Sequence, residues 1–278
     1  MSDEETGARI DKAALRKKLG DRLMGSRFLY FLTLTSTNEH ARELAEDGWP
    51  EGTVVLSEEQ TAGKGRAGRS WHSPGGLGLH VSIILKPALP PERIPLVTLM
   101  AAVATARALR DGGWDATIKW PNDIVLGGRK IGGILADARL RPGAPADVVL
   151  GLGLNVNHLE SDFPPELLPR AGSIRLQTGI EADRTAILAS VLVRIEEAYK
   201  ALREGGAHGD AGLIEAFSAL CPMSRGRAVR IDGDGEPFTG ETAGIAASGA
   251  LRVMTAAGVR EIHVGDVSVG ESTDAPRR

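Results

Sequence analysis

The sequence is poor in cysteine and in aromatic residues. It holds one cysteine, Cys221, which excludes a disulfide framework within the chain and fits a protein of a reducing compartment. No metal-ligand or thiol-catalysis pattern surrounds that cysteine, so we expect an inert thiol. With two tyrosines and five phenylalanines, the chain has few rings on which nucleic acid bases could stack.

The chain also lacks an excess of basic charge and any long apolar run. The net charge is −3 at pH 7, so the whole molecule has no electrostatic footprint for nucleic acid. No apolar run approaches the roughly 20 residues of a membrane span. The start, MSDEETGARIDKAALRKK, has no apolar core, so no secretory signal is predicted. We expect a cytoplasmic protein with neither nucleic acid nor membrane as partner.

What is present is typical of a globular protein with a substantial core. The chain has 278 residues, 42% of them hydrophobic and 25% charged, which allows one large domain or two of modest size. Residues 11–19 form an amphipathic pattern too short for a helix-turn-helix. A helix is predicted from Ser36, where Ser36 as N-cap and Glu39 three residues later form a capping box. The expected strands are 27–35, 52–60, 77–85, 123–126, 129–137 and 147–157, and the further helices are 91–113, 184–204 and 211–220.

The pattern of predicted secondary structure changes after Pro222. Short strands with Gly and Asp turns follow at close spacing, a pattern typical of a small all-β barrel of about 45 to 50 residues. We therefore predict an α+β protein in which a mixed β-sheet flanked by helices precedes a small C-terminal β-barrel. The expected segments are a tail with a short helix at 1–25, a main domain at 26–222 and a C-terminal domain at 223–278.

A glycine-rich loop carries the first chemical signal. Gly63, Gly65 and Gly68 have the spacing of a dinucleotide-binding turn, but the RSWHSPGG that follows cannot be the helix that such a turn requires. Walker A and kinase patterns are also incomplete. The remaining features are three cations, Lys64, Arg66 and Arg69, with Trp71 at the far end. Such a loop is suited to bind an anion and later release it. The alternative is a solvated surface loop.

The segment KWPND, Lys119 to Asp123, is the second signal. Pro121 restricts the backbone, so the residues around it are presented in a rigid turn between strands. Asn122 and Asp123 offer oxygen ligands for Mg²⁺, a carboxylate base, or only a turn cap.

Lys130 is the third signal, because it lies in the otherwise apolar RKIGGIL of a strand. Gly127 and Gly128 before it predict a hairpin turn. Burial of an unpaired ammonium is costly, so we expect an anion at its tip. Gly132 and Gly133 leave room for a flat ligand, whereas the alternative is an edge-strand lysine that blocks aggregation.

These features together fit one reaction, in which two anions are brought together and their repulsion is cancelled. A carboxylate that attacks the α-phosphate of ATP needs cations on both partners and Mg²⁺ on the leaving pyrophosphate. The product, an acyl-adenylate, must be protected from water by a closing loop.

The sequence from about Thr35 to Val269 resembles the biotin protein ligases. The motifs, in the family's order, are TSTN, EQTAGKGRAGRSWHSPGG, KWPNDIVLGGRKIGGIL and GLGLNVN, followed by RGRAVRI in the C-terminal segment. The resemblance implies a catalytic domain and an SH3-like C-terminal barrel. It also implies the activity of a biotin–[acetyl-CoA-carboxylase] ligase, in which biotin and MgATP give biotinyl-5′-AMP. Biotin is then transferred to one lysine of a biotin carboxyl carrier protein by a monomer or homodimer.

The resemblance also assigns roles to single residues. Catalysis would fall to Lys130, Arg66 and Asp123, with Asp123 also a Mg²⁺ ligand or the acceptor of the carrier lysine's proton. The biotin site would comprise Ser36, Thr37, Asn38, Gln60, Gly63, Lys64, Gly65, Arg66, Lys130 and Gly133. The ATP and adenylate site would comprise Arg66, Arg69, Trp71, Asn122, Lys130 and Asn155.

The chain departs from the family pattern in two ways. Lys64 stands where the loop's first arginine is common, which keeps the charge but loses the planar fork. Ser36 also comes too early for an N-terminal DNA-binding domain, so repressor activity is not expected. The alternatives are a lipoate or octanoate ligase, against which KWPND and the C-terminal segment argue, and a nucleic-acid-binding module, against which the net charge argues.

Overall fold

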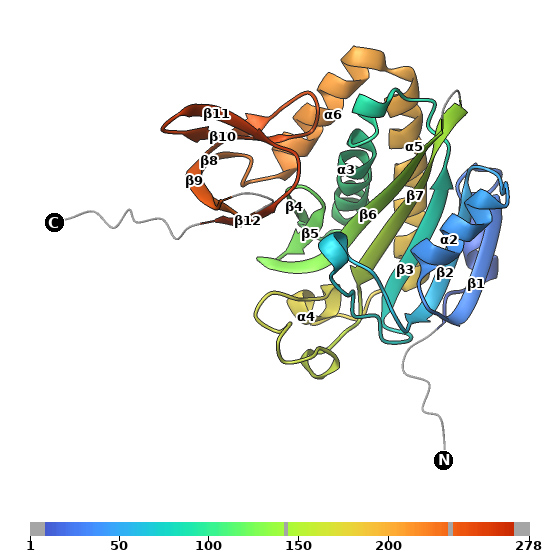
Figure 1. The fold of residues 1–278 in the computed structure, drawn as a ribbon. Helices are drawn as coiled ribbons and strands as arrows, with labels where there is room; N and C mark the ends of the chain where they lie inside the picture. The colour runs from blue at the N-terminus through green and yellow to red at the C-terminus, as the bar shows by residue number, and fades with distance from the viewer. Residues whose placement is uncertain (1–8, 142–143, 233–235, 270–278) are drawn as a thin grey trace.

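The computed structural model describes residues 9–141, 144–232 and 236–269, and it contains two β-sheets (Figure 1). The larger sheet has the strand order β1-β2-β3-β7-β6-β5-β4. Only β1 and β2 pair in parallel, and the other neighbours are antiparallel, so the predicted mixed sheet is confirmed. Its strands are β1 (Arg27–Leu34), β2 (Thr53–Gln60), β3 (Gly78–Leu85), β4 (Thr117–Lys119), β5 (Asp123–Leu126), β6 (Arg129–Arg141) and β7 (Ala144–Asn155).

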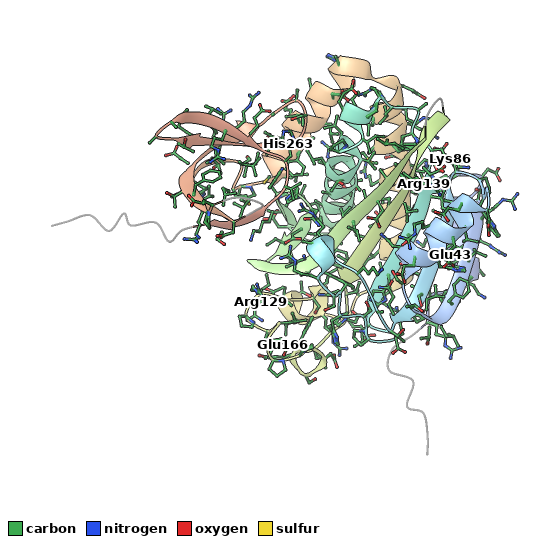
Figure 2. The ribbon with its side chains drawn as sticks, in the orientation of Figure 1. Glu43, Lys86, Arg129, Arg139, Glu166 and His263 are labelled. Carbon is green, nitrogen blue, oxygen red and sulfur yellow. The ribbon has the colours of Figure 1, made fainter. Side chains whose placement is uncertain are left out.

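Helices cover both faces of this sheet because its central strands are apolar on both sides. Val54 and Leu56 of β2 belong to a large core with the long helices, whereas Val55 packs with Ala41 and Leu44 on the opposite face. Figure 2 shows how side chains fill this space, with the labelled Glu43 at the periphery. The helices are α1 (Lys12–Leu19), α2 (Thr37–Glu46), α3 (Leu96–Asp111), α4 (Ile174–Thr178), α5 (Arg184–Glu204) and α6 (Gly206–Leu220). No helix in the described part of the chain has the length and apolar character that a membrane crossing requires.

Helix α2 begins where the sequence predicts, but the predicted capping box is wrong. The side chain of Ser36 makes no capping hydrogen bond. Instead, the backbone N–H of Thr37 donates to Oε1 of Gln60 at 2.8 Å, and Glu39 pairs with Lys64. Lys64 therefore takes the carboxylate that a capping box would use, and Gln60 satisfies another backbone N–H of the first turn.

The predicted hairpin between β5 and β6 is confirmed. Gly127 and Gly128 have φ angles of 56° and 78°, and Leu126 pairs with Arg129 across them. Positive φ at both central residues matches the twist of the flanking strands and favours glycine. The hairpin places Lys130 one residue after the start of β6.

The C-terminal region is an antiparallel sheet with the order β11-β10-β9-β8-β12. In the described part of the chain, β11 and β12 lie at opposite edges of the sheet. The C-terminal β-structure is thus confirmed, while closure into a barrel is not found there. The strands are β8 (Arg225–Asp232), β9 (Phe238–Ile245), β10 (Leu251–Thr255), β11 (Gly258–Ile262) and β12 (Asp266–Val269).

The two sheets are joined through Trp120 and the end of α6. The indole N–H of Trp120 donates to the carbonyl of Gly249 at 2.9 Å, which links the turn after β4 to the C-terminal sheet. Cys221 follows α6 and is fully buried. Burial raises the pKa of its thiol to about 11, which keeps it protonated near neutral pH and fits the inert thiol expected from the sequence.

Candidate active site

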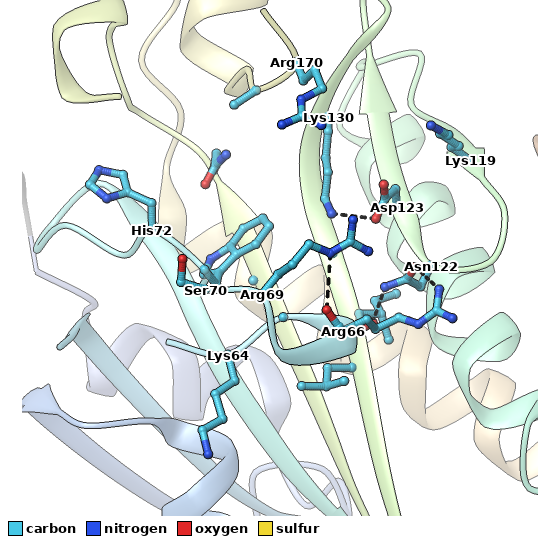
Figure 3. A pocket seen from close by; sticks show the side chains of 18 of the residues that line it. Lys64, Arg66, Arg69, Ser70, His72, Lys119, Asn122, Asp123, Lys130 and Arg170 are labelled. Atoms are coloured by element: carbon cyan, nitrogen blue, oxygen red, sulfur yellow. Dashed lines mark hydrogen bonds and ion pairs between the residues drawn. The ribbon is translucent and has the colours of Figure 1, made fainter. Parts of the chain in front are cut away.

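A cavity of about 650 Å³ lies against the α2 face of the large sheet, beneath the glycine-rich loop (Figure 3). The loop contributes Trp71, the sheet contributes Gly133 and Gly153, and the C-terminal sheet contributes Asp232 and Val267. Distant parts of the chain therefore meet around one space. Of the residues predicted for the site, those that line it are Ser36, Thr37, Asn38, Gln60, Lys64, Gly65, Arg66, Arg69, Trp71, Asn122, Asp123, Lys130, Gly133 and Asn155.

Gly63 is the one predicted site residue that does not line the cavity. It supports the loop instead, since its carbonyl accepts from the backbone N–H of Trp71 at 2.8 Å. A Cβ at Gly63 would come 2.6 Å from the carbonyl oxygen of Trp71 and 2.9 Å from Oγ of Ser73. Glycine is therefore required there by close packing within the loop.

One end of the cavity carries uncharged polar groups. The hydroxyl of Thr37 donates to Oε1 of Gln60 at 3.1 Å, and Nε2 of Gln60 donates to Oγ of Ser73 at 3.0 Å. Asn38 lies one residue further along α2 and is buried. These hydroxyl and amide groups can donate and accept hydrogen bonds to a neutral ligand.

The other end is dominated by cations. Nζ of Lys130 lies 2.6 Å from Oδ1 of Asp123, and Nη1 of Arg66 donates to Oδ1 of Asn122 at 3.1 Å. In Figure 3 the side chains of Arg66, Arg69 and Lys130 gather near each other. Guanidinium and ammonium groups in a partly enclosed cavity suit carboxylate and phosphate ligands.

The sequence-based expectation for Lys130 needs one correction. Its side chain is 37% exposed, so the ammonium is not buried in the sheet. The anion expected at its tip is Asp123, from the adjacent strand β5. Spacing did not reveal this pairing, because Asp123 and Lys130 are brought together by the hairpin and by a register shift between β5 and β6.

The glycine-rich loop folds back on itself rather than opening a helix, as predicted. A 3₁₀ turn spans Arg66–Gly68, and the backbone N–H of Gly65 donates to the carbonyl of Arg69 at 2.7 Å. Lys64 pairs with Glu39 on α2, and its side chain points away from the other cations in Figure 3. The turn thus directs Arg66 and Arg69 inward and leaves Lys64 at the rim.

Trp71 closes the cavity against strands β6 and β7. A Cβ at Gly153 would come 2.5 Å from Cε2 of Trp71, and one at Gly133 would come 3.4 Å from the same ring. Nζ of Lys130 lies 5.5 Å from the centre of that ring. Glycine at position 153 makes room for the indole beside Lys130, whereas a Cβ at position 133 would make only an ordinary contact with it. The role of Gly153 was not foreseen, although the alternating glycines of GLGLN indicated close approach to the backbone.

A loop after β7 completes the cavity, and sequence reasoning assigned nothing to it. Phe163, Leu167 and Arg170 line the space. The backbone N–H of Lys130 donates to the carbonyl of Arg170 at 2.9 Å, so this loop is fixed to the start of β6. Asn155 holds its other side, donating from Nδ2 to the carbonyl of Gly172 at 2.9 Å.

Buried titratable groups lie behind the cavity wall. Burial alone would raise the pKa of Glu58, but the adjacent Arg184 guanidinium, at 2.7 Å, and the Tyr30 hydroxyl lower it below its usual value. Burial lowers the pKa of His80 to about 4 and that of His158 to about 3, and the charge of Arg184 acts in the same direction. His158 stacks on Phe163 with ring centres 5.1 Å apart, which supports a wall of the cavity.

The donor set around the cavity fits a metal that binds mainly to phosphates. Among the described residues no group of three or more His, Cys, Asp or Glu side chains could hold a metal ion. Mg²⁺ usually keeps several waters and takes one or two protein carboxylates plus substrate phosphates. Asp123, which lines the cavity and pairs with Lys130, is a carboxylate of the kind that would suit such a metal.

Comparisons with known proteins match both sheets. Residues 28–155 match the model of the biotin/lipoate A/B protein ligase family, and residues 226–270 match that of the biotin protein ligase C-terminal domain. The bifunctional ligase/repressor BirA of Bacillus subtilis is 35% identical over 263 residues, which cover 94% of this chain and 80% of that protein. A biotin–[acetyl-CoA-carboxylase] ligase of Mycobacterium tuberculosis is 33% identical over 195 residues, or 67% of this chain and 70% of that protein.

A solved structure supports the same relationship. The biotin protein ligase of Aquifex aeolicus, in complex with biotin and ATP, aligns with a TM-score of 0.75 at 29% identity. The alignment covers 89% of this chain and all of the other. The similarity therefore extends over the large sheet, the cavity and the C-terminal sheet.

Proposed function

This chain belongs to the biotin protein ligase family, and on that premise we propose that it activates biotin with ATP and transfers the biotinyl group to a carrier protein. The first product would be biotinyl-5′-AMP, and the acceptor would be one lysine of a biotin carboxyl carrier protein. The observation that carries this proposal is the single cavity with an uncharged polar end and a cationic end. Biotin has the complementary ends, a neutral urea and a carboxylate.

In the first step a carboxylate oxygen of biotin attacks the α-phosphorus of ATP. The bond from that phosphorus to its bridging oxygen breaks, and pyrophosphate leaves. Lys130 would lie between the two anions and cancel their repulsion, which is worth most in a cavity that excludes water. Arg66 and Arg69 would bind the phosphate oxygens by charge-assisted hydrogen bonds.

Asp123 serves both parts of the reaction in this proposal. With one or two carboxylates sufficient for a phosphate-bound Mg²⁺, Asp123 would hold the metal, whose charge offsets that of the leaving pyrophosphate. In the second step the amine of the carrier lysine attacks the acyl carbon and AMP leaves. The carboxylate of Asp123 would accept the proton that the amine loses.

The loop and the C-terminal sheet would enclose the adenylate. Trp71 would lie beside the adenine, with Phe163 on the neighbouring loop. Asp232 and Val267 bring the C-terminal sheet to the cavity, which supports a role for residues 223–278 in binding ATP or the carrier. We place the boundary of the catalytic domain at residue 222, three residues before β8 begins and four residues before the match to the C-terminal family model begins.

A lipoate or octanoate ligase is not favoured. The model that matches the large sheet describes biotin and lipoate ligases together, but the match at 226–270 is to the biotin protein ligase C-terminal domain. The relatives named above are likewise biotin ligases.

The proposal is tested by incubating the purified protein with biotin, MgATP and an isolated biotin carboxyl carrier domain. Mass spectrometry should show one biotinyl group on a single lysine of the carrier. The same mixture with a carrier whose target lysine is replaced by alanine should show none. A carrier that stays unmodified while the protein is folded would contradict the proposal.

A further inference from the structure

Strand β3 carries a serine hydroxyl in the interior of the sheet. Ser82 has no exposed surface, and its neighbours Val81 and Ile83 belong to the large core. Burial of a hydroxyl costs free energy unless the group is hydrogen-bonded. Oγ of Ser82 lies 2.8 Å from Oγ1 of Thr37 and 2.6 Å from Oδ1 of Asn38. Both partners line the cavity, whereas Ser82 itself does not.

The direction of these hydrogen bonds follows from neighbouring groups that can act only as a donor or only as an acceptor. The backbone N–H of Thr37 can only donate, and it lies 2.8 Å from Oε1 of Gln60, so Nε2 of Gln60 points the other way. The carboxylate of Asp137 can only accept, and it lies 3.2 Å from Nδ2 of Asn38. Oδ1 of Asn38 therefore faces Ser82, which donates its one hydrogen there. The hydroxyl of Thr37 lies within hydrogen-bond distance of both Ser82 and Gln60, and its one hydrogen can go to either of them at a time.

The backbone opposite Ser82 is shaped to the same amide. Ser82 pairs with Gly151 of β7, and a Cβ at Gly151 would come 2.1 Å from Oδ1 of Asn38. The amide of Asn38 thus occupies the space that a side chain at position 151 would fill. Ser82 and Gly151 together hold Asn38 in one position, the first by a hydrogen bond and the second by leaving room.

This held amide lies at the uncharged end of the cavity, apart from the cations. Gly151 precedes Gly153, which contacts Trp71 and pairs with Gly133 beside Lys130, by two residues of β7, or about 7 Å along the strand. Thr37, Asn38 and Gln60 present hydroxyl and amide groups with defined directions. Such a set matches a neutral ligand group that has both N–H donors and a carbonyl acceptor, as a cyclic urea does.

We propose that Ser82 is a positioning residue that orients Thr37 and Asn38 for the urea ring of biotin. The proposal rests on the function proposed above, because it takes biotin as the substrate. Ser82 does not touch the ligand but fixes two residues that do. Its loss should therefore weaken biotin binding and leave the chemical step and ATP binding intact.

The test is steady-state ATP–pyrophosphate exchange by Ser82→Ala. We expect the KM for biotin to rise roughly five- to tenfold, as for one lost hydrogen bond, with kcat and the KM for ATP within about twofold of wild type. With 2-iminobiotin, whose urea oxygen is replaced by nitrogen, the increase should be smaller. The ratio of the KM for 2-iminobiotin to the KM for biotin should therefore be smaller in Ser82→Ala than in the wild type.

Ser57→Ala is the matched control. Ser57 is 1% exposed in the adjacent strand β2, but its hydroxyl donates to the backbone carbonyl of Glu59 at 2.6 Å and it does not line the cavity. Ser57→Ala should lower the melting temperature without a change in the KM for biotin. If Ser82→Ala does not fold, Asp137→Ala releases the other side of the Asn38 amide from an exposed position and should raise the same KM.

The outcomes separate the two proposals. A Ser82→Ala enzyme with an unchanged KM for biotin, or with both KM values raised equally, would overturn the positioning role while the wild type remains active. An inactive wild type would instead overturn the proposed function.

Discussion

Lys130 and Asp123 form an ion pair, 2.6 Å from Nζ to Oδ1, across two neighbouring strands of the cavity floor. In the proposed mechanism this pair would bring a cation for two anionic substrates together with a carboxylate for Mg²⁺ or a proton. Both side chains remain partly exposed, 37% for Lys130 and 24% for Asp123, so incoming substrates can reach them.

Lys130→Ala should keep the fold and lose most adenylate formation. Removal of one charge that stabilises a transition state typically costs about 10²- to 10³-fold in rate. Biotin-dependent pyrophosphate exchange measures the loss, and Lys18→Ala on the exposed face of α1 is the control. Near-normal exchange by Lys130→Ala would remove this residue from the mechanism.

Arg66→Ala should weaken retention of the nucleotide. Its guanidinium donates to Asn122 at the cavity wall, and loss of charge-assisted bonds to phosphate should raise the dissociation constant for ATP or adenylate roughly ten- to a hundredfold. Arg66→Lys keeps the positive charge but loses the planar guanidinium, so its dissociation constant should lie between those of the wild type and Arg66→Ala. Release of labelled adenylate in a trapping assay checks this order, and equal release from all three proteins would refute it.

Gly153→Ala should displace Trp71. The new Cβ would come 2.5 Å from the indole, so the ring must leave its place beside Lys130. We expect weaker ATP binding and a changed tryptophan emission. Gly75→Ala is the matched control, because its Cβ would meet only ordinary contacts at 3.7 Å or more. Unchanged ATP binding in Gly153→Ala would show that this position of Trp71 is not needed.

Stability should fall as the pH drops below about 6.5, partly because of the two buried histidines. The folded-state pKa of His158, about 3, lies below its usual 6.5, so the unfolded chain binds more protons between these values. The contribution is present above pH 6.5 and is lost as the pH falls toward 3. Replacing His158 by Phe should reduce the difference in unfolding free energy between pH 7 and pH 5 by about 2 kcal/mol.

Urea unfolding at the two pH values measures this difference, and His263→Phe is an exposed control. An identical pH dependence for wild type and His158→Phe would show that His158 is not buried in its neutral form.

Local chemistry made much of the fold predictable. The glycine pair at 127 and 128 predicted the hairpin, because few other residues adopt the φ angles that it needs. The predicted capping box at Ser36 did not form, and its Glu39 instead pairs with Lys64, which is distant in sequence. Local patterns are reliable only where no tertiary contact competes for the same groups.

The site was predictable in composition but not in its pairings. The cations and glycines in the sequence indicated a binding cavity. However, the pairing of Lys130 with Asp123 depends on strand register, and the position of Trp71 depends on the space left by Gly153. Ser82 was overlooked although LGLHVSIIL carries a hydroxyl within an apolar strand. A polar residue at a buried position is a signal worth following, since it requires a partner.

The most direct measurement of the central claim is ATP–pyrophosphate exchange by the purified wild-type protein, with biotin, octanoate and lipoate in parallel. We predict exchange with biotin and none above background with the two fatty acids. Exchange with the fatty acids but not with biotin would assign the cavity to the lipoyl branch of the family. A folded protein that supports exchange with none of the three would contradict the account.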